Sequence, residues 1–296
     1  MQYFKVFLEN LRPRQWTKNL LLFAGVIFAQ KLGDSTCVVR ALLGMVVFCF
    51  SSGVIYVFND IADQHLDQRH PTKRNRPIAS GRLPVRVAVR MGLGLFLICL
   101  VSAWLLGPAF LGGVCLFFLW NWLYTRWLKR IPVLDVSGIG MSFVIRATAG
   151  VLVLLPGCPG VGISPWLLLC TFFLSLFLGS CKRRDELLRV DPANGETRPV
   201  LRAYSEPGIN AMIGASFGLT LMMYGLYTVW PDTVAHFGTR DLIYTIPFVL
   251  GGLGRYTYLV YLEDKGGKPH EILLNDLLLQ VIVVGWIVAA VKIIGT

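Results

Sequence analysis

The stretch NDIADQHLDQRHPTKRNRP, residues 59–77, follows directly on the apolar run MVVFCFSSGVIYVF at 45–58. The apolar run has the composition of a segment that crosses a bilayer. The stretch after it holds three aspartates and four Lys or Arg within 19 residues. One interpretation is a polar loop between two membrane helices. The other is a site for a metal ion and a polyphosphate at the membrane surface.

The composition of the whole chain indicates an integral membrane protein. Hydrophobic residues make up 55% of the 296 positions and charged residues only 15%, which is more apolar surface than a soluble domain of this length needs. About 20 apolar residues cross the hydrocarbon layer. The candidate spans are 19–33, 41–58, 87–106, 108–123, 136–155, 165–180, 209–230, 242–261 and 277–294. The predicted fold is therefore all-α, a bundle of nine transmembrane helices that forms one domain over 1–296.

The distribution of basic residues predicts how this bundle is oriented. If the N-terminus is cytoplasmic, the inside segments hold 23 Lys or Arg and the outside segments hold 4. Cytoplasmic loops carry such an excess, so we predict a multi-pass protein of the inner (plasma) membrane with its N-terminus inside and its C-terminus outside. The inside segments 59–86 and 181–208 are long and mix acids with bases. We expect them to carry the active site.

Three acids in the first of these segments have helical spacing. Asp60, Asp63 and Asp67 are three and four positions apart, which places them on one face of a helix. Carboxylates stacked in this way repel one another unless a cation joins them, and Mg²⁺ is commonly shared between carboxylates and substrate phosphates. We predict the three aspartates to be catalytic metal ligands for Mg²⁺, with Mn²⁺ as a substitute. The alternative is a solvated acidic helix end.

A cationic block follows these acids and begins at Arg69. Arg and Lys bind phosphate oxygens, and acids for a metal together with cations for phosphates are what a diphosphate–Mg²⁺ complex requires. The predicted substrate-binding residues of this segment are Asn59, Lys73, Arg74 and Arg76.

Several motifs resemble one superfamily. NDIADQHLD resembles the NDxxDxxxD motif of the UbiA superfamily of intramembrane prenyltransferases, and RPIASG matches it too. The stretches RPRQWTKNLLLFAG, HPTKRNRPIASGRLP, LYTRWLKRIPVLDV, FVIRATAG, LGSCKRRDEL and GKPHEILLNDLLLQ are most similar to its decaprenyl-phosphate phosphoribosyltransferase branch. The resemblance implies nine helices and a cytoplasmic active site. It also implies Mg²⁺-dependent transfer of a 5-phosphoribosyl group from phosphoribosyl diphosphate to a polyprenyl phosphate, with release of diphosphate.

The second inside segment departs from the superfamily pattern. Aromatic prenyltransferases carry another DxxD-type cluster after the sixth helix, whereas 181–189 reads CKRRDELLR. Phosphoribosyl diphosphate has a 5-phosphate that adds about 1.5 to 2 negative charges, so extra cations suit it better than a second metal cluster. The predicted substrate-binding residues here are Lys182, Arg183 and Glu186. The alternative is that these bases only set the membrane topology.

Four residues elsewhere are expected to serve the same site. Lys18, just before the first span, could hold the lipid phosphate, and Tyr124 and Lys129 could line the same cavity. Topology signalling is the alternative for both lysines. Arg146 lies about ten residues into an apolar run, where an Arg costs about 2.5 kcal/mol or more. We predict that it faces the bundle interior and is catalytic, with a structural ion pair as the alternative.

Two other functions stay open from the sequence alone. One is transfer of a prenyl group from its diphosphate to an aromatic or other small acceptor, with the same fold. The other is a polyanion transporter, although transporters place polar sites near the membrane midplane and the charges here gather at helix ends.

The expected partners follow from the favoured reaction. They are phosphoribosyl diphosphate, a polyprenyl phosphate and membrane lipids, and no nucleic acid; a homo-oligomer stays open. The seven cysteines lack C-x-x-C spacing and are expected to be small buried apolar residues.

Overall fold

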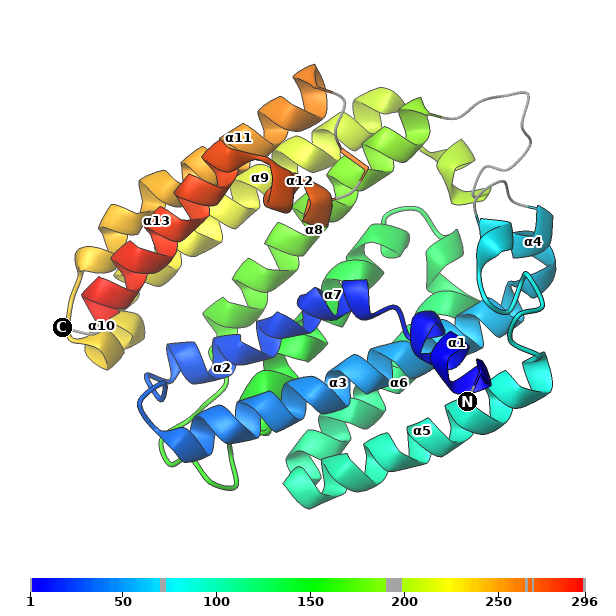
Figure 1. Ribbon diagram of the computed structural model, residues 1–296. Coiled ribbons are helices and arrows are strands. Elements are labelled where there is room, and N and C mark those ends of the chain that lie inside the picture. Colours follow the sequence, from blue (N-terminus) through cyan, green and yellow to red (C-terminus); the bar gives the residue numbers. More distant parts are fainter. Residues whose placement is uncertain (1, 70–72, 190–198, 264–265, 268, 295–296) are drawn as a thin grey trace. The chain divides into compact units, whose positions relative to one another are not determined.

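The computed structural model describes residues 2–69, 73–189, 199–263, 266–267 and 269–294 (Figure 1). Within these ranges every regular element is a helix, which confirms the predicted all-α class. The chain divides into two compact units. The first comprises Met1–Arg126 and Val144–Ile163, and the second comprises Trp127–Phe143 and Ser164–Thr296.

The first unit is built around one long helix, α3 (Ser35–Ala62), which packs against most of the other elements of the unit. The antiparallel helix α5 (Val85–Leu106) lies along it (Figure 1). The remaining elements, with η marking 3₁₀ helices, are α1 (Gln2–Asn10), η1 (Pro13–Leu22), α2 (Phe23–Phe28), α4 (Gln64–Arg69), η2 (Lys73–Asn75), α6 (Pro108–Arg126) and the second half of α7 (Leu134–Leu152).

The helix that carries the acidic motif stops within the motif. Asp63 follows the last residue of α3 and has φ −94° and ψ 5°, and α4 begins at the next position. Short polar side chains such as Asp favour this kind of helix end because they compete for backbone hydrogen bonds. The expectation that Asp60, Asp63 and Asp67 share one face of one helix is therefore wrong, since Asp67 belongs to α4.

The segment 59–86 is folded onto the unit by apolar side chains. Ile78 and Leu83 are fully buried and share a core cluster with Phe7, Leu11 and Val57. Burial of each such side chain contributes about 1.5–3 kcal/mol. The segment is thereby held against α1, α3 and α5 rather than extending into solvent.

The N-terminal segment and α7 approach backbone to backbone. A Cβ added to Gly150 would lie 2.2 Å from the carbonyl oxygen of Leu22, and one added to Gly25 would lie 2.5 Å from the carbonyl oxygen of Gly150. Glycine permits this approach, as small residues commonly do between membrane helices. The sequences NLLLFAG and RATAG thus form the two sides of one close contact.

Two cysteines correct the expectation that the cysteines are only apolar filling. Cys37 and Cys158 form a disulfide across 121 positions, a separation that gives no pattern in the sequence. Arg40 links the same end of α3 to two neighbouring segments. Its Nε donates to the carbonyl oxygen of Val153 at 2.7 Å, and its Nη2 donates to the carbonyl oxygen of Leu106. Of the five free thiols, three are buried as expected.

The second unit is built on α8 (Pro165–Leu188) and α9 (Glu206–Val229), which lie side by side (Figure 1). Phe177 of α8 and Ile213 of α9 are buried in one cluster with Tyr256 and Leu279. The remaining elements are η3 (Leu128–Arg130), the first half of α7, η5 (Pro199–Ala203), α10 (Pro231–Phe237), η6 (Asp241–Thr245), α11 (Ile246–Leu262), α12 (Pro269–Asn275) and α13 (Leu277–Ile294).

The described part of the chain contains seven helices that are long and apolar enough to cross a membrane, so the protein is a multi-pass membrane protein. Two of the nine predicted spans do not form such a helix. The run 19–33 is divided between η1 and the short α2, and the run 242–261 between η6 and α11, which has 17 residues. The count of nine remains a prediction.

The glycine contact predicts a loss of stability in the Gly150→Ala variant. The added methyl group meets backbone atoms, which cannot rotate away, and overpacking costs about 1–3 kcal/mol. The purified variant should therefore melt at a lower temperature than the parent protein. Gly94→Ala is the matched control, since a Cβ there meets nothing within 4 Å. Equal melting temperatures for the two variants would contradict the close contact.

The disulfide predicts a thiol count. The denatured protein should react with a maleimide–polyethylene glycol reagent at five thiols before reduction and at seven after it. Cys37→Ser should give six adducts with or without reductant, because its former partner becomes free. Cys99→Ser should instead give four before reduction and six after it. Seven adducts from the unreduced parent protein would exclude the bond.

Candidate active site

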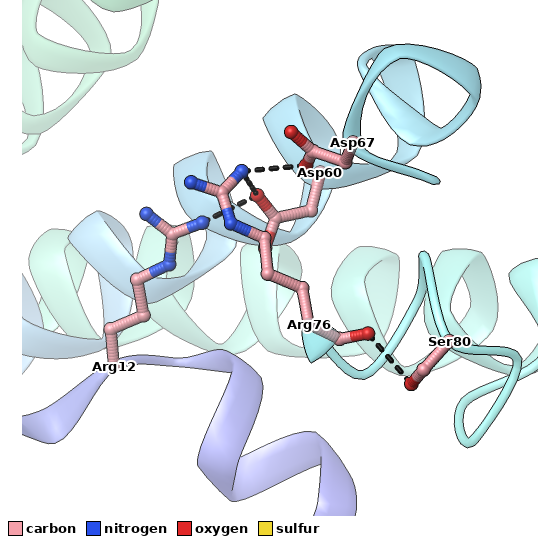
Figure 2. A network of polar contacts seen from close by, with 5 residues as sticks. All are labelled: Arg12, Asp60, Asp67, Arg76 and Ser80. Carbon is pink, nitrogen blue, oxygen red and sulfur yellow. Dashed lines mark hydrogen bonds and ion pairs between the residues drawn. The ribbon is translucent and has the colours of Figure 1, made fainter. Parts of the chain in front are cut away.

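The polar contacts of the first unit meet at Asp60, in the last turn of α3 (Figure 2). The residue is only 2% exposed. Nη2 of Arg12 donates to its Oδ1 at 2.5 Å, and Nη1 of Arg76 donates to the same oxygen at 3.0 Å. A buried carboxylate is strongly destabilising unless cations pair with it, and these two guanidinium groups provide that charge.

Arg76 joins two of the predicted aspartates. Its Nη1 also donates to Oδ2 of Asp67 at 2.6 Å, and Asp67 is buried (Figure 2). The backbone of Arg76 is itself fixed, because the hydroxyl and the N–H of Ser80 donate to its carbonyl oxygen at 2.8 and 2.9 Å. The RPIAS turn therefore aims this side chain at the end of α3.

Arg12 reaches Asp60 from a left-handed turn between α1 and η1. Its φ of 54° and ψ of 64° lie in a region that residues other than glycine rarely adopt. The guanidinium also lies over the ring of Tyr56, 4.8 Å from its centre, one helical turn before Asp60. The turn thus brings the N-terminal segment and α3 together at the acid.

A second ion pair ties α1 to the same segment. Nη1 and Nη2 of Arg82 donate to the two carboxylate oxygens of Glu9 at 2.9 and 2.8 Å, and Nη2 donates to the carbonyl oxygen of Asn75 at 3.0 Å. The hydrogen bond from Arg82 lowers the pKa of Glu9, so the pair contributes stability above the ordinary pKa of a glutamate and loses it as pH falls through the lowered one. Because both side chains are exposed, this contribution is small.

One oxygen of Asp60 is suited to a metal ion. Its Oδ2 is buried and has no hydrogen-bond partner among the described residues, and such an acceptor costs about 1–3 kcal/mol. No three acids, histidines or cysteines gather around one point among the described residues. A divalent ion would therefore be held by Asp60 with Asp63 or Asp67, and Mg²⁺ commonly completes such a site with waters and substrate phosphates.

Arg146 belongs to a separate buried cluster. Its Nε donates to Oδ1 of Asn19 at 2.9 Å, and its guanidinium lies 4.6 Å from the centre of the Phe117 ring. The same Asn19 oxygen accepts a hydrogen bond from Ser52 at 3.4 Å. Ser52 precedes Asp60 by eight residues, or about 12 Å along α3. Arg146 is buried, and these contacts tie it to η1 and α6.

The end of α8, in the second unit, carries two polar faces. Helical periodicity places Lys182, Arg183 and Glu186 within one arc of about 100° and Arg184 and Asp185 within another. On the first face, Nε of Arg183 lies 2.7 Å from Oδ2 of Asp135 and its Nη1 donates to Glu186. Nζ of Lys182 lies 3.9 Å from Glu186. This face therefore holds a carboxylate between two cations.

The opposite face of α8 serves packing within the second unit. Nε of Arg184 donates to Oδ1 of Asn210 at 3.1 Å, and its guanidinium lies 4.1 Å from the centre of the Tyr261 ring. Asp185 accepts from Arg189 at 2.9 Å, and a Cβ at Gly267 would lie 2.4 Å from its carboxylate. The run KRRDE thus has two faces. One contacts α9 and α11 through Arg184, and the other contacts the start of α7 through Arg183.

Comparison with known proteins identifies the family. The UbiA prenyltransferase family matches residues 20–271. The chain belongs to this family.

The decaprenyl-phosphate phosphoribosyltransferase of Corynebacterium glutamicum is 32% identical over 95% of this chain and 84% of that protein. The decaprenyl-phosphate phosphoribosyltransferase of Mycobacterium tuberculosis is 31% identical over 94% of this chain and 91% of that protein. A UbiA homolog from Archaeoglobus fulgidus bound to DMAPP and Mg²⁺ has a TM-score of 0.70 at 18% identity, over 98% of this chain and 99% of that one. At that identity the likeness shows a shared fold.

In this UbiA-family chain the predicted site residues fall in both units. Those of the first unit are Lys18, Asn59, Asp60, Asp63, Asp67, Lys73, Arg74, Arg76, Tyr124 and Arg146. Those of the second unit are Lys129, Lys182, Arg183 and Glu186. Arg76 joins Asp60 and Asp67, and Arg183 and Lys182 flank Glu186. The catalytic and binding roles of all these residues remain predictions.

Sequence reasoning missed four residues of these clusters. Arg12 was counted only as a topology signal, although it is the partner of Asp60. Asn19 and Asp135 are polar residues at the edges of apolar runs, and the cost of burying such groups could have marked them. Tyr204, which donates to Asp135 at 2.5 Å, lies in a loop without any motif.

The contacts of Arg76 predict a stability loss in Arg76→Met. The change leaves two buried carboxylates with less countercharge, which costs about 3 kcal/mol when a buried pair is broken. The variant should melt at a clearly lower temperature in detergent than the parent. Arg74→Met, two positions away and exposed, should melt like the parent. If both variants behaved alike, the buried pairing at Asp60 and Asp67 would be incorrect.

Proposed function

We propose that this UbiA-family transferase moves a 5-phosphoribosyl group from phosphoribosyl diphosphate to a polyprenyl phosphate of the decaprenyl type and releases diphosphate. The observation that carries the proposal is the similarity to decaprenyl-phosphate phosphoribosyltransferases over almost the whole chain. The cations of α8 support this donor, because its 5-phosphate adds about 1.5 to 2 negative charges that a prenyl diphosphate lacks.

We assign a divalent ion to the aspartate cluster. Asp60 would hold Mg²⁺ with Asp63 or Asp67, with Mn²⁺ as a substitute, and the ion supplies positive charge for the diphosphate. The buried Asp60 oxygen, which has no hydrogen-bond partner in the described part of the chain, supports this assignment. So does the Archaeoglobus fulgidus UbiA homolog, which is bound to Mg²⁺. The proposed phosphate-binding residues beside it are Asn59, Lys73, Arg74 and Arg76.

The proposed reaction exchanges one C–O bond for another. The bond between ribose C1 and the diphosphate oxygen breaks, and its electron pair leaves with diphosphate. A new bond forms between C1 and an oxygen of the lipid phosphate. That oxygen is already ionised at neutral pH, so no general base is required. The protein contributes positioning and charge stabilisation.

The remaining predicted residues are assigned by charge. Lys182 and Arg183 serve the phosphates of the donor. Lys18, with Tyr124 and Lys129, serves the phosphate of the acceptor lipid. Arg146 keeps its assignment as a catalytic residue, and its bond to Asn19 supports a fixed orientation of the guanidinium.

We further propose that this chemistry takes place on the cytoplasmic side of the bacterial inner membrane, with the N-terminus inside and the C-terminus outside. The excess of basic residues in the inside segments supports this orientation. The disulfide of Cys37 supports it independently. Cys37 lies near the start of α3, opposite the Asp60 end, and disulfides persist in oxidising compartments outside the cytoplasm.

A second candidate function is prenyl transfer from a prenyl diphosphate to an aromatic or other small acceptor. The structural neighbours favour it, because structures of a UbiA homolog from Archaeoglobus fulgidus with the same fold are bound to GPP or DMAPP together with Mg²⁺. The full-length similarity to phosphoribosyltransferases outweighs this likeness, since the structural neighbours are only 18–19% identical.

A donor assay tests the proposed function. The purified protein in nanodiscs should convert polyprenyl phosphate with phosphoribosyl diphosphate and Mg²⁺, and should lose turnover in excess chelator. Asp60→Asn should lower turnover at least about a hundredfold, as loss of a charge-stabilising group does. Asp232→Asn, an exposed acid of α10, should have no effect. Turnover of a prenyl diphosphate but not of phosphoribosyl diphosphate would overturn the donor, and full turnover with chelator would overturn the metal.

A further inference from the structure

The face of α8 that turns toward α7 is held by a network buried within the second unit. Asp135, at the start of α7, is 0% exposed and forms a close ion pair with Arg183, which is also buried. Arg183 in turn donates to Glu186. A buried ion pair of this kind fixes geometry, because neither charge can leave without exposing the other to an apolar environment. Glu186 is therefore the outer end of a rigid chain of contacts.

Tyr204 forms two hydrogen bonds at the buried end of this series of contacts. Its hydroxyl donates to Asp135 at 2.5 Å and accepts from the backbone N–H of Val133 at 2.7 Å. Burial, together with the bond to Asp135, raises the pKa of Tyr204, so the phenol stays protonated and keeps donating. Val133 has φ 68°, which a β-branched residue adopts only where its surroundings enforce it. Strained backbone is often found beside functional groups.

We infer that Glu186 recognises the hydroxyl groups of the ribose in the donor, and that Arg183, Asp135 and Tyr204 are positioning residues that orient its carboxylate. This inference rests on the proposed function and names the group that distinguishes the donor from a prenyl diphosphate.

The hydrogen-bonding capacity of a carboxylate supports this inference. Ionised glutamate is only an acceptor, with about four acceptor positions, and it repels phosphates. Glu186 is nevertheless placed among cations that suit a polyanionic donor, and its side chain stays 24% exposed. Arg183 and Lys182 lie on either side of it, and its exposed part leaves acceptor positions that a ligand can reach. The ribose hydroxyls are the only donors that phosphoribosyl diphosphate offers, and carboxylates bind ribose hydroxyls in the same way in dinucleotide-binding proteins.

Deoxy donors test the inference. Turnover of polyprenyl phosphate would be measured with phosphoribosyl diphosphate and with its 2-deoxy and 3-deoxy analogues, for the full-length parent and for Glu186→Gln. The ratio of kcat/KM between ribosyl and deoxy donors should fall about 10- to 100-fold in the variant for at least one analogue, the range of a hydrogen bond to a charged group. The intrinsic reactivity of each donor cancels when the two proteins are compared.

Asp185→Asn is the matched control, because that adjacent acid lies on the packing face of α8 and contacts Arg189. It should keep the parental ratio. Asp135→Asn and Tyr204→Phe should shift the ratio in the direction of Glu186→Gln but less far, an effect that loss of stability alone does not produce. Thermal melting would show that the variants are folded, and Glu186→Asp replaces Glu186→Gln if the latter is not.

The outcomes separate this inference from the function on which it rests. Turnover of phosphoribosyl diphosphate with unchanged donor ratios for both analogues in the Glu186 variant overturns the ribose assignment and leaves the proposed function in place. The same ratio change in Asp185→Asn also overturns the assignment. No turnover of phosphoribosyl diphosphate by the parent protein overturns both.

Discussion

The first unit depends on the burial of a negative charge at the end of a membrane helix. Asp60 is 2% exposed, and an unpaired carboxylate in such a place would cost several kcal/mol. Two arginines from different segments of the first unit offset this cost by pairing with the carboxylate. Arg12 comes from the left-handed turn after α1, and Arg76 comes from the RPIAS turn after α4. The convergence of these two segments on α3 is therefore an electrostatic requirement, which the burial of Ile78 and Leu83 then supports.

The same arrangement is compatible with the metal site that we propose at Asp60. Both arginines donate to Oδ1 of Asp60, and Oδ2 is buried with no hydrogen bond from any residue that the structure describes. A protein selected for stability alone would satisfy that atom, since an unsatisfied buried acceptor lowers stability. The proposed coordination of a hard cation requires such an oxygen, because a metal ligand needs a lone pair that no donor occupies.

The sequence predicts the charges of the site better than it predicts their partners. The helical class, the acidic motif and the basic block after it are local patterns, and periodicity and composition reveal them. The pairing of Arg12 with Asp60 spans 48 positions and that of Arg183 with Asp135 spans 48 as well, and no local pattern encodes such contacts. The break of the helix at Asp63 was equally hidden, because an aspartate is compatible with both the interior and the end of a helix. The two faces of KRRDE could have been predicted from the 3.6-residue period alone.

Contacts of η1 link the acidic site to the centre of α7. Arg146 and Gly150 are four positions apart and lie on one face of α7, and they meet Asn19 and Leu22, which are three positions apart in a 3₁₀ helix. A 3₁₀ helix repeats every three residues, so its contacts with an α-helix stay in register over one turn.

The 3₁₀ helix η1 runs for ten residues, whereas such runs seldom exceed about four. Both α3 and α7 contact this helix. Because Arg12 lies directly before η1, the glycine contact and the Arg146 bond fix the position from which Arg12 reaches Asp60. Arg146, in the middle of α7, thus contacts the segment that begins directly after Arg12, the partner of Asp60.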